Sequence, residues 1–336
     1  MNILYPEDCK TFSSGSTYYW GSLFGSSEAL ALIEFAKTQQ QVVLYVAKDI
    51  KHYVQIQRAL NFYNSSLKIL GFSNWEVLAF DHFSPHPDIV SSRLETLSQL
   101  ATLKTGIVIT TLESLSQRLC PTDYIDKYSF SLNAGETLEI EPFVNKLLKI
   151  GYRRVSTVME QGEFNIKGAL IDLYPMGAKS PYRIDLFDNE IDSIRTFKAS
   201  TQRSIDVINH INLLPAREFA SDSESISIFK KNYLSEFGNT DGFIYEEVSE
   251  GRFPGGIEFY LPLFFNKTNI SLPFRRSIDR VGISLVTNVK YFENKFNVES
   301  ISTPKGGTSL SRFSSAGNNN PTNSPDGFNM WLTRRI

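Results

Sequence analysis

The stretch QVVLYVAKDIKHYVQIQRALNFY, residues 41–63, decides the fold class. Its first seven residues are largely apolar and β-branched, which is typical of a strand buried on both faces of a sheet. Residues 48–63 then carry apolar side chains at helical spacing. A buried strand that runs straight into a helix begins a crossover connection, so this stretch indicates a parallel sheet covered by helices.

The same alternation of strand and helix signals continues through the first third of the chain. Residues 66–72 and 75–80 are strand candidates, and residues 89–103 are helical. Residues 106–119 have the pattern of a buried strand that runs into a helix. We therefore expect an α/β fold in which a parallel sheet has helices on both faces.

From about residue 156 to residue 197 the apolar period changes to two, which is typical of antiparallel hairpins. The segments EFNIKGALIDLYP and YRIDLFDNEIDSIRTF carry this pattern, with Asp188-Asn189 as a turn signal. Helical spacing precedes this region in residues 141–152 and returns in residues 211–238. We expect a smaller α+β unit with antiparallel hairpins after the parallel one.

The strand PYRIDLF, residues 181–187, has one apolar face and one mixed face. Arg183 and Phe187 share the mixed face, and Lys167 of EFNIKG joins them if the strands pair. An arginine beside an exposed aromatic ring is typical of a protein interface. The alternative is a solvated sheet face with a stray aromatic residue, because single exposed apolar residues are common. Spacing alone leaves both interpretations open.

Residues 20–35, WGSLFGSSEALALIEF, have the outline of a phosphate-binding loop that opens a helix. In a working loop, a lysine reaches the phosphates and a Ser or Thr hydroxyl binds Mg²⁺. Glu28 stands at the lysine position here, and its carboxylate repels polyphosphate. The alternative is a strand-to-helix turn whose glycines only permit a tight bend. In either case we expect no cofactor at the degenerate loop formed by Gly21, Gly25, Ser26, Ser27 and Glu28.

No motif in the sequence predicts catalysis or metal binding. His82 and His86 are four residues apart, but the prolines of DHFSPHPD prevent the helical geometry of a zinc pair. The chain has neither a nucleophile elbow nor a convincing Cys–His arrangement. We therefore expect no metal site and no enzymatic activity for this chain.

Composition excludes several further classes. The net charge of −2 disfavours a dedicated nucleic-acid binder, and two cysteines make no disulfide framework. No secretory signal is visible, and no apolar run approaches the ~20 residues of a membrane span. We expect a cytoplasmic protein with no membrane partner. The last part of the chain is rich in Ser, Asn, Gly and Pro, which predicts disorder in residues 291–336.

The run QGEFNIKGALIDLYPMGAKSPYRIDLFDNEIDSIRTFKASTQRSIDVINHINLLPARE, residues 161–218, resembles the N-terminal part of the bacterial transcription-repair coupling factors (Mfd). It is also similar to the equivalent part of the excision-repair helicase UvrB. WEVLAFDHFSPHPDIVSSRLETLSQL (75–100) and GIEFYLPLFF (256–265) extend the resemblance, which covers roughly residues 10–265.

The resemblance implies four segments. Residues 1–123 are expected to form a degenerate RecA-like domain similar to UvrB domain 1a, and residues 124–211 an inserted UvrA-binding domain similar to UvrB domain 2. Residues 212–290 would complete the UvrB-homology module, and residues 291–336 would form the low-complexity tail. The loss of the lysine at Glu28 agrees with the degenerate nucleotide loop of this family.

The resemblance also implies a partner. Two arginines and a phenylalanine of the family contact UvrA, and they fall here on Lys167, Arg183 and Phe187. The lysine keeps the charge of the first arginine but loses its planar, bidentate fork.

The function implied is a non-catalytic, UvrA-recruiting adaptor of transcription-coupled nucleotide excision repair. The full-length parents are ATP-dependent DNA translocases that also bind RNA polymerase and double-stranded DNA. Past residue 270 the similarity fades, so we expect a truncated coupling factor without motor or polymerase-binding domains, with weak or no DNA binding. Two alternatives stay open: an ATP-dependent UvrB-like DNA-binding or helicase protein, and an inactive relic fragment.

Overall fold

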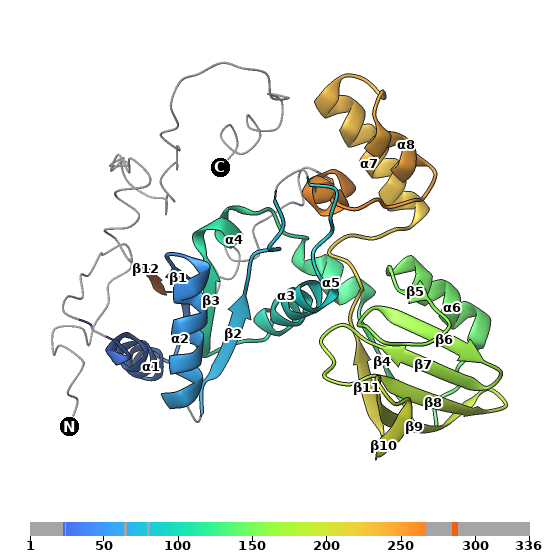
Figure 1. Ribbon diagram of the computed structural model, residues 1–336, viewed down its shortest axis with the longest axis horizontal. Coiled ribbons are helices and arrows are strands. Elements are labelled where there is room, and N and C mark those ends of the chain that lie inside the picture. Colours follow the sequence, from blue (N-terminus) through green and yellow to red (C-terminus); the bar gives the residue numbers. More distant parts are fainter. Residues whose placement is uncertain (1–22, 24, 64–65, 79–80, 267–283, 288–336) are drawn as a thin grey trace. The chain divides into compact units, whose positions relative to one another are not determined.

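The computed structural model describes residues 23, 25–63, 66–78, 81–266 and 284–287 (Figure 1). The chain divides into two compact units. Unit 1 is built from the described parts of residues 1–72, 104–117 and 281–336, and unit 2 from those of residues 73–103 and 118–280. The tail expected to be disordered, residues 291–336, lies outside the described residues.

Unit 1 holds a parallel sheet of strand order β12-β1-β3-β2. Every residue of β1 (Val42–Ala47) and of β3 (Gly106–Thr111) is buried, because apolar and β-branched side chains occupy both faces of these strands. The outer strands are β2 (Lys68–Phe72) and β12 (Ser284–Thr287). The strands predicted within residues 41–47, 66–72 and 106–119 are therefore confirmed.

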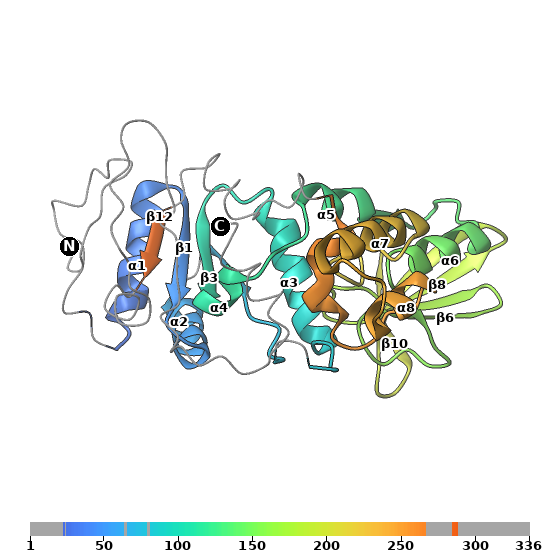
Figure 2. The same cartoon turned by 90° about the horizontal axis from the view of Figure 1, so that it is seen from above.

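Helices cover this sheet (Figure 2). Helix α1 (Ser27–Gln39) and helix α2 (Ile50–Tyr63) share one hydrophobic core with alternate residues of the central strands, among them Tyr45 and Ile109. The short helix α4 (Leu112–Ser116) follows β3 directly. The α/β character expected from the sequence is thus confirmed for this part of the chain.

Unit 2 holds a six-stranded sheet of order β10-β9-β8-β7-β6-β5. All neighbours in it are antiparallel except β5 and β6. The predicted hairpins are confirmed, and their turn at Asp188 adopts a left-handed φ of 51°. The strands are β5 (Arg153–Arg154), β6 (Glu163–Lys167), β7 (Leu170–Tyr174), β8 (Tyr182–Phe187), β9 (Glu190–Lys198) and β10 (Arg203–Ile208).

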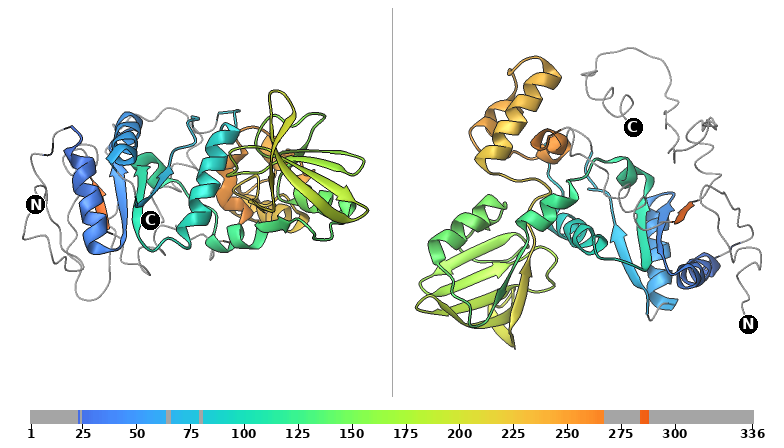
Figure 3. Two further views of the ribbon diagram at one scale, coloured as in Figure 1. Left: turned by 90° about the horizontal axis from the view of Figure 1, so that it is seen from below. Right: turned by 180° about the vertical axis from the view of Figure 1, so that it is seen from behind.

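Unit 2 contains further elements besides this sheet. A two-stranded sheet joins β4 (Phe130–Asn133) to β11 (His210–Leu213), and helix α6 (Ile140–Lys149) overlaps the predicted helical stretch of residues 141–152. Helix α7 (Ser223–Phe237), helix α8 (Phe243–Ser249) and the 3₁₀ helix η2 (Ile257–Phe264) lie beside one another (Figure 3). Their side chains, Phe229 among them, form an aromatic cluster with Phe219. The remaining helices are α3 (Pro87–Leu100) and α5 (Thr122–Tyr128).

Two sequence expectations are wrong. Residues 210–213 are a strand rather than the start of a helix, so helical spacing holds only from Ser223. The strand expected at residues 75–80 is absent over 75–78, its described part. Glu76 adopts a left-handed φ of 58°, which ends any extended run, and Trp75 is instead buried against Phe259 with ring centroids 5.4 Å apart.

None of the described helices has the length and apolar character needed to cross a bilayer.

Candidate partner-binding face

The register of the six-stranded sheet arranges alternate side chains in rows on one face, which we call the open face. Lys167 pairs with Leu170, and Leu170 pairs with Asp185 on the next strand. Phe187 lies two residues beyond Asp185 and so points to the same side. Lys167, Arg183 and Phe187 therefore share one face, as strand alternation predicts. The open face consists of Asn165, Lys167, Leu170, Asp172, Arg183, Asp185, Phe187 and Arg195, of which Asn165 and Asp172 are themselves buried.

The opposite face of this sheet carries the apolar set that fixes it in place. Phe164, Ile171, Ile184 and Ile194 are each 0 % exposed. Slipping any strand by one residue would bring polar side chains into this core. The register, and with it the arrangement of the open face, is therefore strongly specified.

Arg183 is held firmly by neighbours on the open face. Its Nε and Nη2 donate to Asp172 Oδ1 and Oδ2 at 2.7 and 2.9 Å, and its Nη1 donates to the Gln202 carbonyl at 3.1 Å. Its guanidinium carbon also lies 4.9 Å from the centre of the Phe197 ring. The bond to Asp172 raises the pKa of Arg183. Three of its five N–H groups thus donate hydrogen bonds within the chain. These bonds fix the orientation of the guanidinium and of its two other N–H groups.

A second ion pair neutralises the carboxylate between Arg183 and Phe187. Arg195 Nη1 lies 3.2 Å from Asp185 Oδ2, and the Ser193 hydroxyl lies 3.4 Å from the same oxygen. Asp172 and Arg195 were not identified from the sequence. The alternation of polar residues along β7 and β9 is the signal that would have placed them on this face.

Lys167 ends strand β6, where Gly168 turns the chain with a φ of 63°. The turn is tied to β8, because the Leu186 amide donates to the Ala169 carbonyl at 2.9 Å. The Lys167 side chain is exposed, and within the described chain it forms no ion pair or hydrogen bond. Its ammonium is therefore available to an anionic group from outside.

Phe187 is 75 % exposed at the end of the β8–β9 hairpin. The hairpin tip is anchored by a neighbouring turn. The Leu138 amide donates to the Asn189 carbonyl at 2.6 Å, and Asn189 Nδ2 donates to Glu139 Oε1 at 2.9 Å. An aromatic ring on a fixed hairpin loses little conformational entropy when a partner covers it.

The two edges of this sheet differ from its centre. Strand β10 exposes Ile205 and Val207, at 60 % and 67 %, and a bulge interrupts its pairing with β9 between Ser204 and Val207. The other edge strand, β5, is only two residues long, and both are exposed arginines.

The degenerate loop is described from Gly25 onward, so Gly21 lies outside the described residues. Gly25 adopts a φ of 59°, and Ser26 precedes helix α1 without capping it through its side chain. Ser27 and Glu28 are the first helical residues. The loop therefore ends at a helix start, as the sequence indicates.

The Glu28 carboxylate is bound by two side chains of unit 1. It accepts a hydrogen bond from the Tyr45 hydroxyl at 2.5 Å and lies 3.0 Å from His52 Nε2. Burial raises the pKa of Glu28, but the contacts with His52 and Tyr45 outweigh burial and hold the pKa below its ordinary value. A fixed anion thus stands in the first turn of the helix that follows the loop.

The histidine pair lies as the prolines predict. Residues 81–86 are a loop, and helix α3 begins at Pro87, with His86 Nδ1 accepting from the Asp88 amide at 3.3 Å. In the part of the chain that the structure describes, no group of three or more His, Cys, Asp or Glu side chains is placed to hold a metal ion.

Comparison with known proteins now gives this face a context. Residues 130–219, which include all of the open face, match the family described as the UvrB interaction domain. The chain is 41 % identical over 248 residues to the transcription-repair-coupling factor of Haemophilus influenzae, which covers 73 % of this chain and 22 % of the relative. It is 37 % identical over 256 residues to that of Escherichia coli, covering 76 % and 22 %.

A more distant relative has the same description. The transcription-repair-coupling factor of Rickettsia bellii is 33 % identical over 235 residues, covering 69 % of this chain and 21 % of the relative. The chain thus spans about a fifth of the length of the relatives it matches. The resemblance read from the sequence is confirmed: residues 130–219 match the UvrB interaction domain family, and about three quarters of the chain is similar to transcription-repair-coupling factors.

Proposed function

We propose that this chain is a non-catalytic adaptor of transcription-coupled nucleotide excision repair that binds UvrA through Lys167, Arg183 and Phe187. One observation carries the proposal: these three side chains share the open face of a sheet that lies within a UvrB interaction domain. The similarity to transcription-repair-coupling factors supplies the biological setting.

The chemistry of the open face suits a protein partner. Phe187 supplies an exposed aromatic anchor, and Lys167 supplies a cation without a partner among the described residues. Arg183 adds a guanidinium that Asp172 and Gln202 hold in one orientation. Aromatic and arginine side chains on a rigid scaffold are the usual sources of binding energy at interfaces.

The proposal includes the absence of nucleotide chemistry. Glu28 opposes phosphate binding at the degenerate loop, so the parallel sheet of unit 1 is assigned as RecA-like but inactive, with no cofactor. The same observation argues against an ATP-dependent helicase of the UvrB type. We assign RNA polymerase and double-stranded DNA as partners to the full-length relatives only. For this chain we propose a cytoplasmic location, where UvrA would be available to it. The domain boundaries at residues 123, 211 and 290 stay a prediction.

The test is calorimetric titration of the full chain with UvrA from the same cells. Phe187→Ala is the decisive variant, because the ring is exposed and its loss should leave the fold intact. Truncating a true interface anchor costs about 2 kcal/mol, so the affinity should fall about thirtyfold. Lys167→Ala should also weaken binding.

Phe62→Ala is the matched control. Phe62 is another exposed phenylalanine, 82 % exposed on helix α2, and its loss should not change the affinity for UvrA. Equal affinity of the wild type and Phe187→Ala would contradict the assigned face. Absence of any binding by a cooperatively folded chain would contradict the adaptor function itself and favour a relic.

A further inference from the structure

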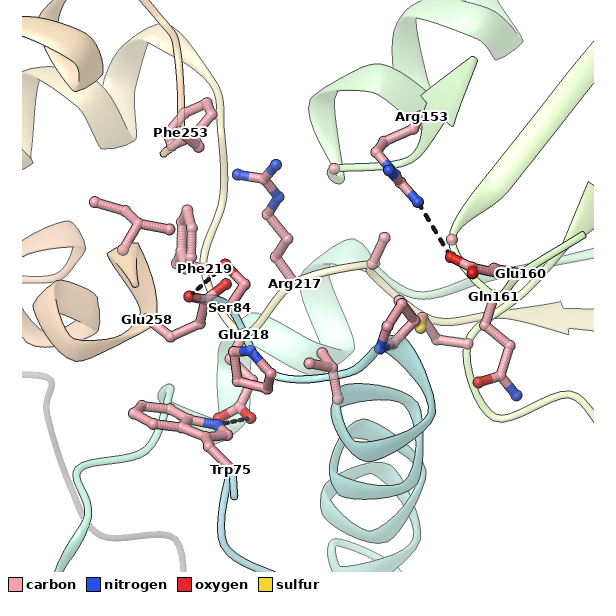
Figure 4. Close-up of a pocket in the computed structure, with 18 residues that line it drawn as sticks. Trp75, Ser84, Arg153, Glu160, Gln161, Arg217, Glu218, Phe219, Phe253 and Glu258 are labelled. Carbon is pink, nitrogen blue, oxygen red and sulfur yellow. Dashed lines mark hydrogen bonds and ion pairs between the residues drawn. The ribbon is translucent and has the colours of Figure 1, made fainter. Parts of the chain in front are cut away.

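Unit 2 contains a cleft of about 430 Å³ that lies apart from the open face. Its apolar walls include Trp75, Val90, Met176 and Phe253, and its charged lining residues are Arg153, Glu160, Arg217, Glu218 and Glu258 (Figure 4). Apolar walls with a few polar groups, in a volume of this order, are typical of small-molecule sites.

The backbone that carries Arg217 is fixed on both sides. The Ala216 amide donates to the Ile150 carbonyl at 2.8 Å, and the Tyr124 hydroxyl donates to the Arg217 carbonyl at 3.0 Å. The next residue, Glu218, is 3 % exposed and bonds to Arg93. Neighbouring groups therefore position Arg217 without using its side chain.

The absence of a side chain at Gly151 leaves space for the side chain of Arg217. A Cβ added at Gly151 would lie 3.0 Å from Arg217 Cγ and 3.2 Å from Cδ, so the missing side chain of Gly151 makes room for the arginine stem. The guanidinium carbon lies 4.7 Å from the centre of the Phe253 ring and 5.6 Å from that of Phe219. Figure 4 shows the guanidinium directed toward Phe253.

Among the residues that the structure describes, none forms a hydrogen bond with the Arg217 side chain. Nη1 is buried without one, and no ion pair is recorded between Arg217 and any carboxylate of the described chain. Burial lowers the pKa of Arg217 even though the charge of Glu258 acts in the opposite direction, which means that the folded chain solvates this cation poorly. An oxyanion with two acceptor oxygens would satisfy the planar fork.

The other charged groups of the cleft are already engaged. Arg153 lies 3.2 Å from Glu163 and 3.6 Å from Glu160. Glu218 is bound by Arg93, and Glu258 accepts a hydrogen bond from the Ser84 hydroxyl at 2.9 Å. Arg217 interacts with the charge of Glu258 only at a distance, so among the described lining residues it is the cation without a direct carboxylate contact.

From this arrangement we propose that the cleft binds a small organic carboxylate, whose oxygens pair with Arg217 and whose apolar body lies against Phe253 and the neighbouring walls. A single unpaired cation suits a monoanion. Glu258 has no ion pair in the described chain and stands in the same cleft, so its charge disfavours a polyphosphate more strongly than a monoanion.

The experiment is calorimetric titration of the full chain with benzoate, which carries a carboxylate on an apolar ring. Benzamide is the matched neutral ligand, and inorganic phosphate tests the other common oxyanion. Benzoate should bind saturably and benzamide should not. Arg217→Gln should weaken benzoate binding at least about tenfold, and Arg217→Lys should weaken it less, because lysine keeps the charge but loses the fork.

Arg154→Gln is the matched control, because Arg154 is an exposed arginine that does not line the cleft, and it should leave benzoate affinity within about twofold. Thermal melting should show each variant folded, since Arg217→Gln removes a buried charge that has no partner. Benzoate binding that survives Arg217→Gln, equal binding of benzamide, or no benzoate binding to the folded wild type would overturn the proposal. Tighter binding of phosphate than of benzoate would overturn the ligand class.

Discussion

Arg93 and Glu218 lie 125 residues apart in the sequence and form a buried, two-pronged ion pair. Arg93 Nε lies 2.5 Å from Oε1 and Nη2 lies 3.1 Å from Oε2, with side chains 0 % and 2 % exposed. The Trp75 indole also donates to Oε1 at 3.1 Å, and Arg93 Nη1 donates to the Ser73 carbonyl at 2.7 Å. This network joins helix α3 to the segment that carries Arg217.

Glu218→Gln should be strongly destabilising, because it leaves the Arg93 charge buried without compensation. We expect the free energy of unfolding to fall by about 3 to 5 kcal/mol, measured by urea denaturation. Glu224→Gln, at an exposed position at the start of α7, should change it by less than about 0.5 kcal/mol. Equal stabilities of the two variants would show that water reaches the ion pair.

Lys167→Arg should tighten UvrA binding. Arginine restores the planar fork and can bind a carboxylate through two parallel hydrogen bonds, whereas lysine offers a point charge. The same change at Lys51, exposed on helix α2, is the control and should leave the affinity unchanged. Calorimetry that finds no gain at position 167 would mean that Lys167 faces no planar anion on the partner.

Arg183→Gln should act on stability as well as on binding. It would leave Asp172, which is 6 % exposed, without its bidentate partner, so unfolding free energy should fall by about 1 to 3 kcal/mol. A double-mutant cycle with Asp172→Asn should give a coupling energy on the order of 1 kcal/mol. Additive effects of the two changes would argue that the pair contributes little.

The contact of Glu28 with Tyr45 and His52 should make stability depend on acid. Because folding lowers the pKa of Glu28 from 4.5, its contribution is complete above about pH 4.5 and is lost as the pH falls through the lower folded value. Glu28→Gln should cost on the order of 1 kcal/mol at pH 7, and less at lower pH.

Urea titrations across this pH range provide the check. Tyr45→Phe, which removes one hydrogen bond to the carboxylate, should shrink the pH-dependent part without abolishing it. Parallel stability curves for the wild type and Glu28→Gln would contradict the role assigned to the carboxylate.

Sequence patterns correctly predicted the features that depend on residues close together in the chain, namely strand faces, helices and a turn. Alternation along PYRIDLF placed Arg183 and Phe187 on one face, because each strand has a core side that fixes the other side. The same reasoning found the strand and helix of residues 41–63 and the turn at Asp188. Positions of this kind depend on neighbours within a few residues.

Partners that lie far along the chain were not predictable. Nothing in the strand YRIDLF says that Asp172 binds Arg183, or that Gln202 accepts from it, because the pairing register and a loop create those contacts. The sequence pattern predicted that Trp75 lies in a strand. Its indole N–H instead donates a hydrogen bond to Glu218, 143 residues away. The sequence did not single out Arg217 for the same reason. Its environment in the cleft is made by residues that are distant in the sequence.

The blunted edges of the six-stranded sheet limit how this chain associates with others. Strand addition needs an uninterrupted row of free backbone groups along an edge, and the bulge in β10 breaks that row beside the exposed Ile205 and Val207. At the other edge, strand β5 has only two residues, both arginines, and is too short to pair with a strand from another chain. The fold thereby resists edge-to-edge aggregation through these two strands, and what this sheet presents to other molecules is its side chains rather than its backbone groups.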